Sequence, residues 1–160
     1  MAKAREIPGL TGQVTFRQAA ALAVETRAAE LFELAQNVLD TDDIERVHDM
    51  RVATRRLRAA MEIFAPCFPK KDLRTTLRDV KALADALGER RDPDVHIEEL
   101  ERIAAALTRD DARGIASLED ELRASQAAGN ETLAAKLREI EETELEKRLR
   151  GLVVSARTSA

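Results

Sequence analysis

The sequence predicts an all-α protein, namely an antiparallel four-helix bundle with an additional long C-terminal helical segment. Residues that favour helices are abundant, whereas the 160 residues include only four Pro and six Gly. Apolar residues recur at spacings of three and four along most of the chain, as on the buried face of an amphipathic helix. Side chains that can cap a helix precede several of these patterns. The length is that of a single domain with one core.

Residues 1–14 are expected to form a flexible lead-in, because Pro8 and two glycines interrupt them. Thr15 and Gln18 then have the spacing of a capping box, in which each side chain bonds the backbone N–H of the other residue. The apolar pattern that follows predicts a first helix from Thr15 to about Leu39.

A second helix is predicted from Asp42 to the residues before Pro66. Asp42 and Glu45 again have capping-box spacing, and acids at this end suit the helix dipole. Pro66 and Pro69 end the helix in a short loop, because proline lacks the N–H that would continue it. Cys67 in this loop is interpreted as apolar packing, and as the single cysteine it excludes a disulfide framework.

One face of this second helix concentrates positive charge. At 100° per residue, His48, Arg51, Arg55 and Arg58 fall within an arc of about 80°. Like charges four residues apart repel on a free helix, and this arc holds almost nothing that would neutralise them. Either neighbouring helices or a bound polyanion must supply negative charge. Arg56 lies about 80° from His48 on the other side, so we interpret it as a rim contact.

A third helix, predicted from Lys71 to Leu87, carries a second basic stripe. Arg74, Arg78 and Lys81 fall within about 60° of one another. Because a short loop makes the second and third helices antiparallel neighbours, the two stripes can lie side by side and form a groove.

Gly88 predicts the end of the third helix, and Asp92-Pro93 predicts the start of a fourth that continues to about Leu107. Arg90 and Arg91 would then lie in a loop. Arg91 could close one end of the groove, or it could pair with a nearby acid and fasten the loop. Both interpretations stay open at this point.

After Thr108 the pattern continues as an acidic helical segment with Leu or Ile every three to four residues, which resembles a bundle seam. Gly129-Asn130 predicts a break within it. We expect residues 15–107 to form the four-helix bundle and residues 108–156 to form a C-terminal helical segment of the same domain.

The charge distribution limits the classes of function. The chain has a net charge of −4, but the segment from Glu45 to Arg91 holds twelve Lys or Arg against seven acids, a net +5, which leaves −9 for the remainder. A local basic region in an acidic protein indicates a bounded anion site rather than coating of nucleic acid by bulk charge. With four Phe and no Trp or Tyr, platforms for stacking single-stranded nucleic acid are nearly absent.

Sequence motifs for catalysis and metal binding are also missing. His48 and His96 have no neighbouring Ser or Cys motif, and neither a P-loop nor H-E-x-x-H occurs. Guanidinium groups around His48 would repel a metal cation. We therefore expect a protein that is not an enzyme and that holds no metal or cofactor. No apolar run approaches a membrane span, and the N-terminus does not read as a secretory signal, so we expect a cytoplasmic location.

Two motifs follow one another along the chain. The first is H-x-x-R-x-x-x-R-R-x-R from His48 to Arg58, and the second is L-G-x-x-R-D-x-D-V from Leu87 to Val95. Together they resemble the CHAD domain, the conserved histidine α-helical domain. The resemblance implies an all-helical protein that binds inorganic polyphosphate on a basic surface, without catalysis. Association with polyphosphate granules in the cytoplasm is a further expectation. The side chains expected to contact polyphosphate are His48, Arg51, Arg55, Arg56, Arg58, Arg74, Arg78, Lys81 and Arg91.

The resemblance also implies a second bundle, because members typically contain two four-helix bundles related by an internal pseudo-twofold. The basic motif occurs once here, so this chain resembles one half, either a half-length protein or a fragment of a longer one. We expect two copies to pair as a homodimer. The alternative, from a different class, is a structural helical scaffold whose basic face docks an acidic protein partner.

Overall fold

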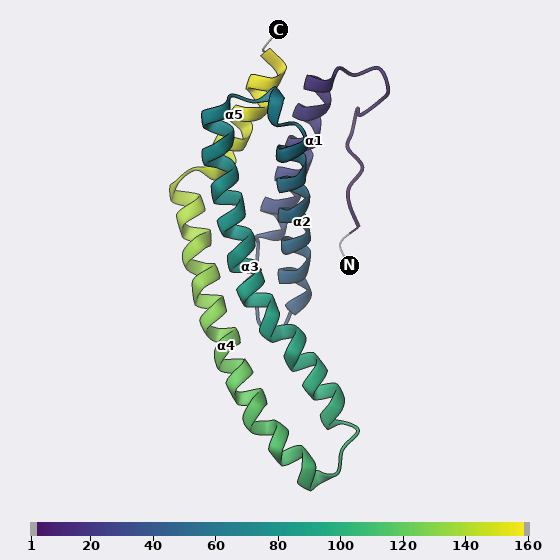
Figure 1. Cartoon of the computed structure of the whole chain (residues 1–160), viewed down its shortest axis with the longest axis vertical. Coiled ribbons are helices and arrows are strands. Elements are labelled where there is room, and N and C mark those ends of the chain that lie inside the picture. Colours follow the sequence, from purple (N-terminus) through teal and green to yellow (C-terminus); the bar gives the residue numbers. More distant parts are fainter. Residues whose placement is uncertain (1–2, 159–160) are drawn as a thin grey trace.

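The computed structural model describes residues 3–158, apart from the side chains of 109–113, and these residues form helices and no strand. The helices are α1 (Phe16–Leu34), α2 (Ile44–Ile63), the 3₁₀ turn η1 (Ala65–Cys67), α3 (Lys70–Ala104), α4 (Arg109–Glu142) and α5 (Leu145–Thr158). The prediction of an all-α helical bundle is confirmed. In Figure 1 the lower parts of α3 and α4 run together beyond the ends of α1 and α2.

The first helix begins where the sequence predicts it and ends earlier. Thr15 Oγ1 accepts from the Gln18 amide at 3.2 Å, and Gln18 Oε1 accepts from the Thr15 amide at 2.8 Å, so the capping box is formed. The predicted end near Leu39 is wrong, because α1 stops at Leu34. Asn37 then adopts a left-handed conformation with φ of 58°, which asparagine tolerates better than most residues and which turns the chain.

The second helix begins one residue later than predicted. The residue that precedes α2 is Asp43, whose side chain makes no capping bond to the backbone. It instead accepts from Arg46 Nε at 2.9 Å. The predicted short connection at Pro66 is present as η1, and Cys67 is buried there, as predicted.

The third and fourth predicted helices form one continuous helix, so the break at Gly88 to Pro93 is wrong. Pro93 lies inside α3 and is buried. An interior proline removes a helical hydrogen bond, so tertiary packing must compensate for it. That packing comes from α4: a Cβ added to Gly129 would stand 3.0 Å from the Arg90 Cα atom, so the two backbones approach closely here. The close approach also explains why Gly129-Asn130 does not break α4.

The C-terminal region consists of two helices joined at Thr143 and Glu144. Glu144 has a φ of 51°, which ends α4, and after this turn α5 continues toward the same end of the bundle as α4. Leu149 and Leu152 of α5 are almost completely buried and belong to the core that α1, α2 and α3 share. The outer faces of α2 and α3 are therefore held in place by a core to which α5 contributes.

Candidate functional site

Contacts between α2 and α3 show how the two basic stripes lie. Near one end of the shared seam, Lys81 Nζ lies 3.2 Å from Glu62 Oε1. Near the other end, Arg91 Nη2 lies 3.6 Å from Glu45 Oε1. The helices are thus antiparallel neighbours, and their outward stripes border the same seam. We call the following set the basic surface: His48, Arg51, Arg55 and Arg58 on α2, with Arg74, Arg78 and Lys81 on α3.

The core fixes the direction in which α2 presents this surface. Met50 and Leu57 are fully buried, and the other side chains on the inner arc of the helix are buried or nearly so. Arg51, Arg55 and Arg58 are exposed on the opposite arc, and His48 is half-buried beside them. The amphipathic division predicted for this helix is present, so the guanidinium groups reach solvent from a rigid support.

Part of the positive charge is neutralised within the chain. Arg58 Nε donates to Glu62 Oε1 at 3.1 Å, the same oxygen that contacts Lys81. Arg78 Nε lies 3.2 Å from Asp79 Oδ1, although Arg78 remains 76% exposed. Asp79 is bound more closely by Arg148 of α5, at 2.7 Å.

The other members of the basic surface stay uncompensated. His48, Arg51, Arg55 and Arg74 make no ion pair with any carboxylate in the described part of the chain. Arg74, Arg78 and Lys81 line an open depression of about 420 Å³ on α3. Positive charge that neighbours do not neutralise, on an accessible face, is the arrangement expected of an anion site.

The basic surface runs diagonally across the seam. On α3 the outer stripe is basic from Arg74 to Lys81, and it becomes acidic at Asp85 and at Glu89, one turn later. The α2 stripe remains basic from Arg58 back to His48. Because the helices are antiparallel, a continuous basic path follows α3 as far as Lys81, crosses the seam beside Glu62, and continues along α2.

Two carboxyl groups beside this surface have altered pKa values. Hydrogen bonds from Arg58 and then Lys81 hold the pKa of Glu62 below its ordinary value, although burial opposes this slightly. For Asp79, burial raises the pKa, but the hydrogen bonds from Arg148 and Arg78 together outweigh it and leave the pKa lowered. Both carboxylates are therefore bound in their charged form.

Arg56 and Arg91, which the sequence analysis included in the site, lie outside the basic surface. Arg56 is turned toward α1 and borders a small depression of about 120 Å³ with Arg5 and Glu30. Arg91 is only 13% exposed and belongs to α3 instead of a loop. Its guanidinium group lies 3.6 to 3.9 Å from three carboxylates: Glu45, Asp94 and Glu98. The interpretation of Arg91 as a structural ion-pair residue therefore fits its surroundings.

A buried polar network lies next to Arg91 and was not predicted from the sequence. Arg90 and Asp94 are both almost fully buried and pair with each other one helical turn apart. Arg90 Nε donates to Asn130 Oδ1 at 3.1 Å, and Gln126 donates to Asp94 Oδ1 at 2.7 Å. Asn130 also donates to the Leu39 carbonyl at 2.9 Å. The network connects α3, α4 and the loop after α1, and the spacing of Arg and Asp by four residues was the signal for it.

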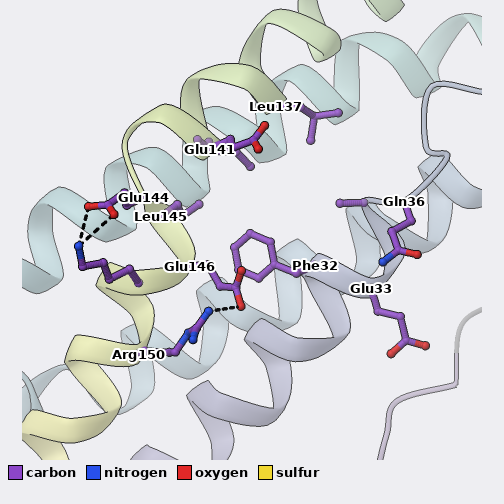
Figure 2. Close-up of a pocket in the computed structure, with 12 residues that line it drawn as sticks. Phe32, Glu33, Gln36, Leu137, Glu141, Glu144, Leu145, Glu146 and Arg150 are labelled. Carbon is purple, nitrogen blue, oxygen red and sulfur yellow. Dashed lines mark hydrogen bonds and ion pairs between the residues drawn. The ribbon is translucent and has the colours of Figure 1, made fainter.

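A cavity of about 780 Å³ lies elsewhere and suits an anion poorly. Figure 2 shows where it lies, between the end of α1 and the α4–α5 turn. Apolar side chains such as Phe32 and Leu137 form its floor, and several glutamates surround it. Its cations are already engaged, because Lys147 contacts Glu144 at 2.9 Å and Arg150 contacts Glu146 at 2.6 Å.

Comparison with known proteins decides the family. The family model described as CHAD domain matches residues 22–160. The chain belongs to the CHAD domain family. CHAD domains are helical domains associated with polyphosphate binding. The match covers almost the whole chain and includes every member of the basic surface. It confirms the resemblance carried by the two motifs.

No curated protein and no solved structure matched this CHAD domain. Among the described residues, no helix is long and apolar enough to span a bilayer. No three His, Cys, Asp or Glu side chains in that part of the chain are grouped so that they could hold a metal ion.

Proposed function

We propose that this CHAD domain binds inorganic polyphosphate, without catalysis, along the basic surface of α2 and α3. The observation that carries the proposal is the row of exposed guanidinium groups, Arg51, Arg55 and Arg74, that no described carboxylate neutralises. Family membership supports the same ligand.

The chemistry of arginine supports a phosphate ligand. A guanidinium group is always charged and presents N–H donors in a plane that matches phosphate oxygens. Residues one helical turn apart repeat about every 5 to 6 Å along the axis. An extended chain of phosphates can therefore contact successive arginines, and each further contact forms while the chain is already tethered. His48 would add a hydrogen bond at the end of the row.

Titration calorimetry with polyphosphates of defined length tests the proposal. We expect a long chain to bind much more tightly than tripolyphosphate, and we expect the affinity to fall steeply as salt is added. Equal affinity per molecule for the two lengths, or an affinity insensitive to salt, would argue against a surface that follows the chain.

A second candidate function is docking of an acidic protein partner on the same surface. The contacts of Glu62 favour this candidate, because they show that Arg58 and Lys81 can bind a carboxylate. The length series separates the two candidates, since a protein-docking face has no reason to distinguish long polyphosphate from tripolyphosphate. A reaction on phosphates is a third candidate, and release of inorganic phosphate during incubation would support it against our proposal of simple binding.

We further propose that two copies of the chain pair, so that two bundles together present polyphosphate-binding surfaces. Light scattering with and without polyphosphate tests this, and a monomer that still binds long chains tightly would contradict it.

We also propose that the protein associates with polyphosphate granules in the cytoplasm. A fluorescent fusion should colocalise with the granules, and it should disperse when the arginines of α2 are replaced.

A further inference from the structure

The Glu62 carboxylate lies where the basic surface crosses from α3 to α2. Its Oε1 atom accepts from Arg58 Nε at 3.1 Å and lies 3.2 Å from Lys81 Nζ. One oxygen is thus held by a guanidinium group of one helix and an ammonium group of the next. A phosphate oxygen is recognised by the same two kinds of donor.

The cluster is open to competing anions. The side chains of Glu62, Arg58 and Lys81 are 42%, 46% and 43% exposed. Ion pairs with this exposure are weak, because water screens them. Glu62 nevertheless has an advantage over a free anion, since it is attached to the same helix as Arg58 and is always close to both cations.

We infer that Glu62 is a specificity-determining residue of the polyphosphate site, because it acts as an internal competitor that a phosphate must displace from Arg58 and Lys81. The inference rests on the proposed function. An isolated phosphate that binds only this pair replaces the contacts of Glu62 and gains little. A long chain makes further contacts with Arg55 on one side and Arg74 on the other, so it stays bound while it displaces the carboxylate.

Displacement of Glu62 has a consequence for protons. The charged groups that act on its carboxyl are Arg58 from α2 and Lys81 from α3, and they hold its pKa below the ordinary 4.5. A bound phosphate takes over both cations and brings negative charge close, and both changes raise the pKa of Glu62. Binding near pH 5 is therefore accompanied by proton uptake at Glu62. Since a protonated Glu62 does not compete, affinity rises as pH falls through this range.

The test compares Glu62→Gln with a matched control, Asp85→Asn. Asp85 is exposed on the same stripe of α3 as Lys81 and borders the depression that Lys81 also lines. Asp85 makes no ion pair with any described cation. Both variants remove one negative charge, so a difference between them reports the direct contacts of Glu62. In calorimetry we expect Glu62→Gln to bind tripolyphosphate about 3- to 10-fold more tightly than wild type. The gain should be smaller for a long chain, and Asp85→Asn should gain less than about twofold for either ligand.

Repeating the titrations near pH 5 in buffers of different ionisation enthalpy measures how many protons are taken up when polyphosphate binds. The wild type should take up more protons than Glu62→Gln, while the end groups of polyphosphate contribute equally to both. If the wild type binds long polyphosphate but Glu62→Gln behaves like Asp85→Asn, the inference is wrong and the proposed function stands. If neither the wild type nor Glu62→Gln binds long polyphosphate, both are wrong.

Discussion

Arg90 and Arg55 carry the same guanidinium group in opposite surroundings. Arg90 is fully buried between α3 and α4, where it pairs with Asp94 and donates to Asn130. Arg55 is exposed on α2 and makes no ion pair with a described residue. A buried charge is tolerated only when partners satisfy it, whereas an exposed and unneutralised one is free to meet a ligand. The comparison separates arginines that hold the fold from arginines that face outward, and replacement of each kind should have a distinct effect.

The largest expected effect is loss of stability when one partner of the buried pair is removed. Asp94→Ala leaves the Arg90 guanidinium buried without its carboxylate, so we expect the free energy of unfolding to fall by about 3 to 5 kcal/mol. Urea unfolding monitored by circular dichroism measures it. A loss below about 1 kcal/mol would mean that the buried network does not stabilise the α3–α4 packing.

The next effect concerns binding without loss of stability. Arg55→Ala should weaken the binding of long polyphosphate by about 1.5 to 3 kcal/mol, roughly tenfold or more in affinity, because a charge-assisted hydrogen bond is lost. The unfolding midpoint should hardly change, since this side chain contributes nothing to the core. Arg56→Ala is the matched control on the same helix, and we expect it to change the affinity by less than about threefold because Arg56 faces α1.

A smaller effect is expected where α3 and α4 approach most closely. In Gly129→Ala the new Cβ would lie 3.0 Å from the Arg90 Cα and 3.1 Å from the Glu89 carbonyl oxygen, so the backbones must move apart. Overpacking of this kind destabilises by about 1 to 3 kcal/mol. Gly114→Ala on the same helix meets nothing within 4 Å and should be neutral or slightly stabilising. Equal stability of the two variants would contradict the close approach.

The smallest expected effect is a pH dependence at Asp79. Burial raises the pKa of this carboxyl, but hydrogen bonds from Arg148 and Arg78 leave it below the ordinary 3.8. A carboxyl whose folded pKa is lowered stabilises the protein above its unfolded pKa, and this contribution is lost as pH falls through the folded pKa. The stability difference between wild type and Asp79→Asn should therefore shrink as pH falls from about 5 through the lowered pKa of Asp79. A difference that stays constant over this range would show that Asp79 has no such role.

The sequence predicted those features that depend on local pattern. The basic arc of α2 followed from a spacing of three and four, and the capping box at Thr15 followed from two side chains close in sequence. Prediction from the sequence failed where packing against residues far away in the chain determined the backbone conformation. Gly88 and Pro93 read as a helix boundary, yet α4 packs against them and keeps α3 continuous. The role of Arg91 could not be settled either, because Glu45, one of its partners, lies on another helix.

The central claim is that the exposed arginines on the outer face of α2 bind a chain of phosphates. The most direct test is a calorimetric titration of long polyphosphate into wild type and into a variant with Arg51, Arg55 and Arg58 all replaced by Ala. A variant with Arg102, Arg123 and Arg138 replaced by Ala serves as the control of equal charge. We predict that affinity falls at least a hundredfold in the first variant and only a few-fold in the control, with both variants folded. Retention of wild-type affinity by the first variant would contradict the account.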